Sequence, residues 1–284
     1  APEQQLLQAL VPDSKIEDIT DKAIEVGKLD KVGSGAVFTI SCNDAHFSEK
    51  FPANIQDSNV TGENKSSDNL EAICCICEIG VADDIAKAAL QHGAPGPTVT
   101  LGEGGGVRDK IPLLRITKGP EKEFVWCIVD KSDSDAIFAD MARAGKITEP
   151  GRGFMYSIPV SSGLINVSST VSSSAHGANM EQIIAALDDL KGGKDWRTSI
   201  DSSKGKSLKT TYLENLVGIY CIVPRVNYPE VYDAILDSGA PGVSTNFGVM
   251  IDAGSDQQQN EEWALVYTSV GPNSVNELRK TVED

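Results

Sequence analysis

The strongest constraint on the fold is that the chain repeats short glycine-containing segments at fixed distances. The sequence Gly-Ala-Pro-Gly begins at Gly93 and again at Gly239, 146 positions later, and each copy is followed by a further glycine after the same interval. The dipeptide Gly-Lys begins at Gly27 and at Gly145, 118 positions apart, and each copy continues into Gly-x-Gly. A supersecondary unit copied within one chain constrains the fold at both places, so the repeats predict related structural units.

The composition limits the classes of partner. A chain of 284 residues is long enough for two domains with separate cores. Its net charge of −16 argues against nucleic acid or an anionic membrane surface as the main partner, because both bind basic faces. No apolar run approaches the roughly 20 residues that a membrane-spanning helix needs, so we expect no membrane insertion. The six cysteines lie mostly in apolar runs, which favours buried thiols in a reducing cytoplasm.

Residues 69–160 are predicted to form one α+β unit. Apolar runs and alternating patterns predict strands, and apolar residues at helical spacing predict helices. The predicted order is strand 70–78, helix 82–92, strand 98–101 running into flexible glycines at 102–106, strand 124–129, helix 133–144 and strand 154–160. This βαβ–βαβ order is the split, ferredoxin-like arrangement, with a four-stranded antiparallel sheet carrying both helices on one face.

The last third of the chain repeats most of this unit. The predicted elements are strand 216–223, helix 229–236, strand 244–248, strand 263–269 and helix 273–283. The chain then stops before a fourth strand. Residues 36–41 match that missing strand, and they follow a predicted helix that opens with the capping box Ser14-x-x-Glu17.

A circularly permuted duplication explains this arrangement most simply. The second, split unit would then comprise residues 1–42 and 212–284, with linkers at 43–68 and 161–211 and a helix at 180–190 inside the second linker. Residues 6–11 resemble strand three, so strand three and helix two occur at both ends. Either one copy docks elsewhere or the chain carries parts of three units.

Two loops in this order resemble those of a known family, the PII signal-transduction proteins and their PII-like relatives. Gly96-Pro97-Thr98-Val99-Thr100 with Gly104-Gly105-Gly106 is similar to the strand and glycines at the base of the family's T-loop. Gly145-Lys146-Ile147 with Gly151-Arg152-Gly153 resembles the family's B-loop, most of all the PGxG variant of the PII-like branch. The resemblance covers residues 70–160 well and the split unit less specifically.

The resemblance implies a homotrimeric regulator, not an enzyme, that binds a nucleotide or small metabolite between units and relays the signal to a regulated enzyme or transporter. ATP, ADP or AMP would be the ligand. Glycine backbone lets N–H groups approach phosphates, and basic side chains supply charge. The ligand-binding residues implied by family position and by these loops are Thr98, Gly104, Gly105, Gly106, Arg108, Lys146, Gly151, Arg152 and Gly153.

Two other functions stay open. One is a trimeric, ferredoxin-like metal-binding protein, in which His46, His92 and His176 with cysteines would be ligands. The other is a structural relative that has lost its pocket. An enzyme is the least favoured reading, because no Ser-His-Asp order, HExxH or P-loop stands out. We predict no catalytic residues and no metal site.

Overall fold

A computed structural model shows an α+β protein with two compact units. It describes residues 5–31, 34–46, 69–106, 120–164, 188, 190, 192–193, 213, 215–251 and 261–283. Unit 1 is Ala1–Val99 with Phe124–Leu208, and unit 2 is Thr100–Glu123 with Lys209–Asp284. The chain passes between the units along strands β3 (Thr98–Gly106) and β4 (Glu121–Asp130). Each unit is described below by itself.

The centre of unit 1 is the predicted βαβ–βαβ repeat. It contains β2 (Leu70–Glu78), α2 (Ala82–Gln91), α4 (Lys131–Ala144) and β5 (Gly153–Pro159), and its strand order is β5-β2-β4. Strands β2 and β5 are antiparallel, in a register that runs from Glu71 opposite Pro159 to Cys77 opposite Gly153. The predicted strands and helices of this repeat are therefore confirmed to within a few residues, apart from β3, which is longer than expected.

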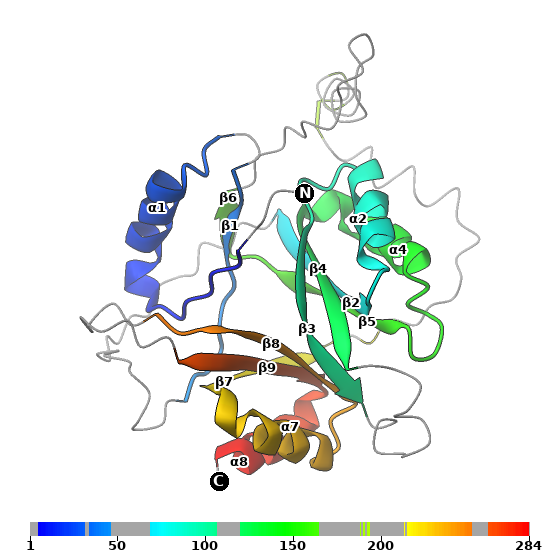
Figure 1. The fold of residues 1–284 in the computed structure, drawn as a ribbon. Helices are drawn as coiled ribbons and strands as arrows, with labels where there is room; N and C mark the ends of the chain where they lie inside the picture. The colour runs from blue at the N-terminus through cyan, green and yellow to red at the C-terminus, as the bar shows by residue number, and fades with distance from the viewer. Residues whose placement is uncertain are drawn as a thin grey trace. The chain divides into compact units, whose positions relative to one another are not determined.

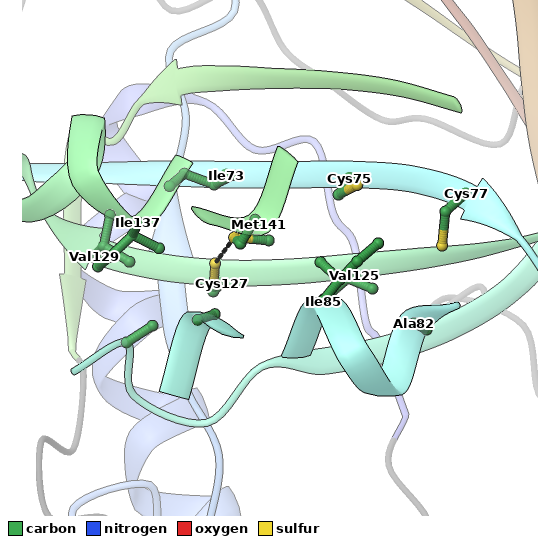
Figure 2. Packing of buried hydrophobic residues seen from close by; sticks show 12 residues of the cluster. Ile73, Cys75, Cys77, Ala82, Ile85, Val125, Cys127, Val129, Ile137 and Met141 are labelled. Carbon is green, nitrogen blue, oxygen red and sulfur yellow. Dashed lines mark hydrogen bonds between the residues drawn. The ribbon is translucent and has the colours of Figure 1, made fainter. Parts of the chain in front are cut away.

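Both helices of this repeat cover one face of the sheet (Figure 2). Ile73, Cys75 and Cys77 of β2 alternate toward the helices, as strand periodicity requires. They pack with Val125, Cys127 and Val129 of β4. Ile85 of α2 and Ile137 and Met141 of α4 close this core from the helix side, and all of these side chains are buried.

The opposite face of β2 has a smaller core of its own. Buried Ala72, Ile128 and Val160 pack there with Phe38, Leu70 and Trp126. Phe38 belongs to β1 (Val37–Thr39), which pairs antiparallel with β6 (Ser162–Leu164). Before β1 the chain forms a short 3-10 helix (Asp13–Lys15) and α1 (Ile16–Gly27).

Unit 2 is built from the last third of the chain and the end of the β3–β4 hairpin. It contains β7 (Val217–Pro224), α7 (Tyr228–Asp237), β8 (Gly242–Val249), β9 (Glu262–Val270) and α8 (Val275–Glu283). Its strand order is β3-β8-β9-β7, and the helices pack on one face, where Ile235, Val266 and Leu278 are buried (Figure 1). All five predicted elements are confirmed. In the described part of the chain, no helix is both long and apolar enough to cross a membrane.

The 146-residue repeat is a shared turn after a helix. Gly93 follows α2 with φ +87°, and Gly239 follows α7 with φ +89°. The N–H of Gly93 donates to the carbonyl of Leu90, and the N–H of Gly239 donates to that of Leu236. Glycine reaches this left-handed backbone without strain, which explains why the residue recurs at both places.

The 118-residue repeat is a second shared turn. Lys28 follows α1 and Lys146 follows α4, and both have φ +51°. The N–H of Leu29 donates to the carbonyl of Ile24, and the N–H of Ile147 donates to that of Ala142. These six-to-one hydrogen bonds are the Schellman pattern of a helix end. In its described residues, the turn that leads from α1 to β1 thus repeats the backbone hydrogen bonds of the turn from α4 to β5.

The strand pairing in the structure differs from that of the predicted permutation, whose domain bounds stay a prediction. The segment predicted at 36–41 is β1, and its registered partner among the described residues is β6 rather than β7. The N-terminal residues accordingly group with unit 1 instead of with residues 212–284. Two separate four-stranded sheets are not found either, because β3 continues past Val99 into unit 2 and pairs there with β8.

Three smaller expectations also need comment. Residues 6–11 are described but carry no regular secondary structure. The capping box at Ser14 does not form: a 3-10 turn precedes α1, and within the described residues no side chain caps the start of that helix. Most of the helix predicted at 180–190 lies outside the described residues.

We predict that Ile137→Ala lowers the free energy of unfolding by about 2 to 5 kcal/mol, because it leaves a cavity in the core of unit 1. Ile137 is 2% exposed. Ile19 occupies the same position of the 118-residue repeat but is 44% exposed, so Ile19→Ala is the matched control and costs less than about 1 kcal/mol. Urea denaturation measures both; equal losses would contradict the burial described here.

Candidate functional site

The candidate site in unit 1 is the loop between α4 and β5, residues 145–153, called the α4–β5 loop below. Its backbone is fixed by local hydrogen bonds. The N–H groups of Lys146, Glu149 and Arg152 donate to the carbonyls of Arg143, Lys146 and Glu149, at 3.2, 2.9 and 3.2 Å. Successive turns of three residues therefore carry the chain from the helix end to the strand.

Gly153 shows why this loop needs glycine. Its φ is +155°, and a Cβ at this position would lie 2.1 Å from the carbonyl oxygen of Ile76. No side chain can be accommodated there, because β5 begins pairing with β2 at this residue. Gly151, two residues earlier, has φ +79°, which also favours glycine.

Arg152 lies between these two glycines and is held by two carboxylates. Its Nη1 is 3.3 Å from Oε2 of Glu78, and its Nε is 3.3 Å from Oε2 of Glu149. Glu78 ends β2 and its side chain is 26% exposed, whereas the side chain of Glu149 is 54% exposed. The guanidinium is half-buried and in a fixed place, so an anion could bind it by replacing the more exposed carboxylate.

The equivalent turn after α1 has no cation at this position. Ser34 occupies the place of Arg152 in the 118-residue repeat, and its hydroxyl donates to the carbonyl of Lys31 at 2.5 Å. Gly35 repeats the backbone of Gly153, with φ +141°. The two turns therefore share geometry but differ in charge.

The glycine triplet Gly104–Gly106 forms the end of β3. There Gly104, Gly105 and Gly106 pair with Ser244, Val243 and Gly242 of β8. A Cβ at Gly106 would come within 3.1 Å of the carbonyl oxygen of Pro241. These glycines let two strands of unit 2 approach closely, so the segment expected to be flexible is part of a paired strand, while its place at the base of a T-loop stays a prediction.

The predicted site residues are distributed between the units. Lys146, Gly151, Arg152 and Gly153 share the α4–β5 loop, and Lys146 is exposed. Thr98 is half-buried at the start of β3, also in unit 1. Gly104, Gly105 and Gly106 belong to unit 2. Arg108 lies outside the described residues, and the ligand-binding roles of all nine residues stay predictions.

Two polar clusters were missed by sequence reasoning. In unit 1, Asp140 of α4 accepts from Arg143 and lies 2.6 Å from Nε2 of His92, at the end of α2. In unit 2, the hydroxyl of Tyr228 donates to Oε2 of Glu103 at 3.1 Å. Each cluster joins segments far apart in the sequence, so only the fold could reveal it.

The Tyr228 cluster combines aromatic rings with charges. Tyr228 packs edge-on against Phe247, and the guanidinium of Arg225 lies over the Phe247 ring at 4.3 Å from its centroid. Arg225 also forms an ion pair with Glu262 at 3.2 Å. Burial first, and then the nearby Glu103 carboxylate, raise the pKa of Tyr228 well above its usual range. The aromatic and charged groups of this cluster contact one another, and these contacts explain the cluster as part of the fold.

Four of the six cysteines are buried, Cys221 is half-buried and Cys42 is exposed. Desolvation by burial raises the pKa of Cys127 to about 12 and that of Cys221 to about 11, and it also raises the pKa values of Cys74 and Cys75. Cys127 contacts the sulfur of Met141 at 3.5 Å inside the core (Figure 2). Among the described residues, no group of three or more His, Cys, Asp or Glu side chains is placed to hold a metal ion.

Comparison with solved structures gives a distant likeness to a PII protein. No protein-family model and no curated protein matches the chain. Among solved structures, the crystal structure of Arabidopsis thaliana PII bound to citrate is similar to 32% of this chain and 78% of that chain, with 20% sequence identity and a TM-score of 0.27. This is a distant and partial resemblance to a PII protein, and it identifies neither a ligand nor a partner.

We predict that Gly153→Ala destabilises the chain by about 3 kcal/mol, because the new Cβ forces β5 away from the Ile76 carbonyl and strains the backbone. Gly93→Ala is the matched control. Its φ is also positive, but a Cβ there meets no atom within 4 Å, so only the strain of about 1 kcal/mol remains. Urea denaturation measures both variants, and a smaller loss at Gly153 than at Gly93 would contradict the close approach.

We also predict that Cys42 reacts first with a thiol reagent at pH 8. Its side chain is exposed, whereas four other cysteines are buried and Cys221 is half-buried with a raised pKa. The thiolate is the reactive form, so burial and a high pKa both slow the reaction. Cys42→Ser should abolish the fast phase, and unfolding in guanidinium should expose all remaining thiols. Several fast thiols in the folded chain would contradict the described core.

Proposed function

We propose that this chain is a non-enzymatic, PII-like regulatory protein that binds a small anionic ligand through the α4–β5 loop. The ligand class is an adenine nucleotide, ATP, ADP or AMP, or a small carboxylate metabolite. The observation that carries the proposal is the placement of Arg152: a half-buried guanidinium between two loop glycines, held by carboxylates at 3.3 Å rather than by close, bidentate hydrogen bonds.

The energetics favour exchange of one carboxylate for a phosphate. The pair between Arg152 and Glu149 is three residues apart in an exposed loop, and such pairs contribute about 0 to 1 kcal/mol. A charge-assisted hydrogen bond from arginine to phosphate contributes roughly 1.5 to 3 kcal/mol. A phosphate can therefore displace Glu149, while Glu78 at the end of β2 keeps the guanidinium in place.

We propose that the functional form is a homotrimer and that the ligand binds between units. We also propose that ligand occupancy is relayed to a regulated enzyme or transporter. The second turn, after α1, would bind no phosphate, because Ser34 replaces the arginine. Replacement of Glu149 by a ligand would change the charge and the shape of the α4–β5 loop together, which is what a partner protein could detect.

We predict that Arg152→Ala weakens nucleotide binding about tenfold or more, since each 1.4 kcal/mol corresponds to a factor of ten. Glu149→Gln should strengthen binding, because it removes the competing carboxylate and keeps the side-chain shape. Ser34→Ala is the matched control and should leave the affinity unchanged. Isothermal titration calorimetry with ATP, ADP, AMP and citrate measures all three variants.

Two outcomes would refute this function. If the unaltered chain binds none of these four ligands, the α4–β5 loop is a structural turn. If it binds one of them and Arg152→Ala binds equally well, the ligand contacts another surface. Unfolding curves of the variants, recorded beside the titrations, separate lost binding from lost structure.

A further inference from the structure

Strand β7 is the last strand in the strand order of unit 2. It pairs with β9 from Val217 opposite Val270 to Pro224 opposite Trp263. No strand of the described residues pairs with its other side. An edge strand presents N–H and C=O groups to any chain that can pair with them, and proteins usually protect such edges with charged residues or internal prolines. The sequence of β7, VGIYCIVP, has no charge and only a terminal proline.

Unit 1 shows what covers the equivalent strand. The 146-residue repeat places β7 at the position of β2, and β2 pairs with β5 from Glu71 to Cys77. Cys74 and Ile76 of β2 are 0% and 5% exposed. Their counterparts in β7, Tyr220 and Ile222, are 44% and 42% exposed. Among the described residues, unit 2 therefore has no strand equivalent to β5.

The chain contains a second copy of the segment that leads into β5. The turns after α1 and α4 share the left-handed lysine, the same backbone hydrogen bonds and the same extended glycine before the strand, Gly35 and Gly153. The strand that follows Gly35 is β1. Strand β6 pairs with β1 over three residues, and no second strand of the described part of the chain pairs with β1.

We propose that the open side of β1 of one copy pairs antiparallel with the outer edge of β7 of a second copy. The two repeats also set the register. Tyr156 is opposite Cys74 in unit 1, and moving these positions by 118 and 146 places Phe38 opposite Tyr220. Val37 then faces Cys221, and Thr39 faces Ile219. The binding partner is a second molecule of this chain.

This interaction runs from the N-terminal part of one copy to unit 2 of another. It can close as a reciprocal dimer or as a ring, including a trimer. Backbone pairing supplies the hydrogen bonds, and side chains on the exposed face of β7, such as Ile222, become covered by the added strand. The inference does not depend on ligand binding at the α4–β5 loop.

Disulfide cross-linking between copies tests the register. Phe38→Cys and Tyr220→Cys are made in separate full-length chains, each with Cys42→Ser to remove the exposed thiol. The two chains are mixed in equal amounts and oxidised mildly. We expect a disulfide-linked dimer containing one copy of each variant, identified by mass spectrometry of the linked peptides. Light scattering of the unaltered chain should show an assembly at micromolar concentration.

The control is Thr39→Cys mixed with Tyr220→Cys. It shifts the thiol by one residue, to the opposite face of the strand, and should give much less cross-linked dimer. Absence of the Phe38–Tyr220 link between copies overturns the proposal, as does equal linkage in the control. A chain carrying both cysteines that closes its disulfide within one monomer also overturns it, because its own segment then covers β7. A stable monomer in light scattering of the unaltered chain would also overturn the proposal.

Discussion

The burial of β2 on both faces is the constraint on which the rest of unit 1 depends. Residues 72–77 are all buried, with the helices on one side and the smaller Ala72 core on the other. A strand buried on both faces has a near-continuous apolar sequence. Shifting its pairing by one residue would turn every side chain to the opposite face of the sheet. Its register with β5 is therefore fixed, and that register places Gly153 opposite Cys77.

The geometry of the α4–β5 loop follows from this register. Because β5 starts at Gly153 beside the Ile76 carbonyl, the preceding residue, Arg152, reaches Glu78 at the end of β2. The cation is thus positioned by strand pairing, while Glu149 contacts it from the loop. In a chain of net charge −16, such a placed cation has a local role, since charges more than about 8 to 10 Å away are largely screened at physiological salt. The proposed anion binding therefore depends on the local contacts of Arg152 with Glu78 and Glu149.

Much of the secondary structure was predictable from the sequence, and the reason is local. Periodicity located α2, α4 and α7, and apolar runs located β2, β4, β7 and β9. The glycine repeats predicted turns because glycine adopts a left-handed backbone without the steric cost that a side chain brings. The strand at Gly104–Gly106 was missed because three glycines carry no alternating side-chain pattern. The contact between Arg152 and Glu78 spans 74 positions, and no sequence signal marks it.

The two copies of the 118-residue repeat show that a local backbone and its burial have different causes. The turns at Lys28 and Lys146 are the same because hydrogen bonds between near neighbours form them. Burial instead needs a second surface. Ile137 meets α2 and the sheet, whereas Ile19 on α1 stays exposed, and α1 has no buried residue. Apolar side chains such as Ile19 stabilise the fold only where another surface removes them from water, by about 25 cal/mol for each Å² of apolar surface that is buried. The sequence of a repeat therefore specifies its shape at both places, while the strands and helices beside it determine how much it stabilises the fold.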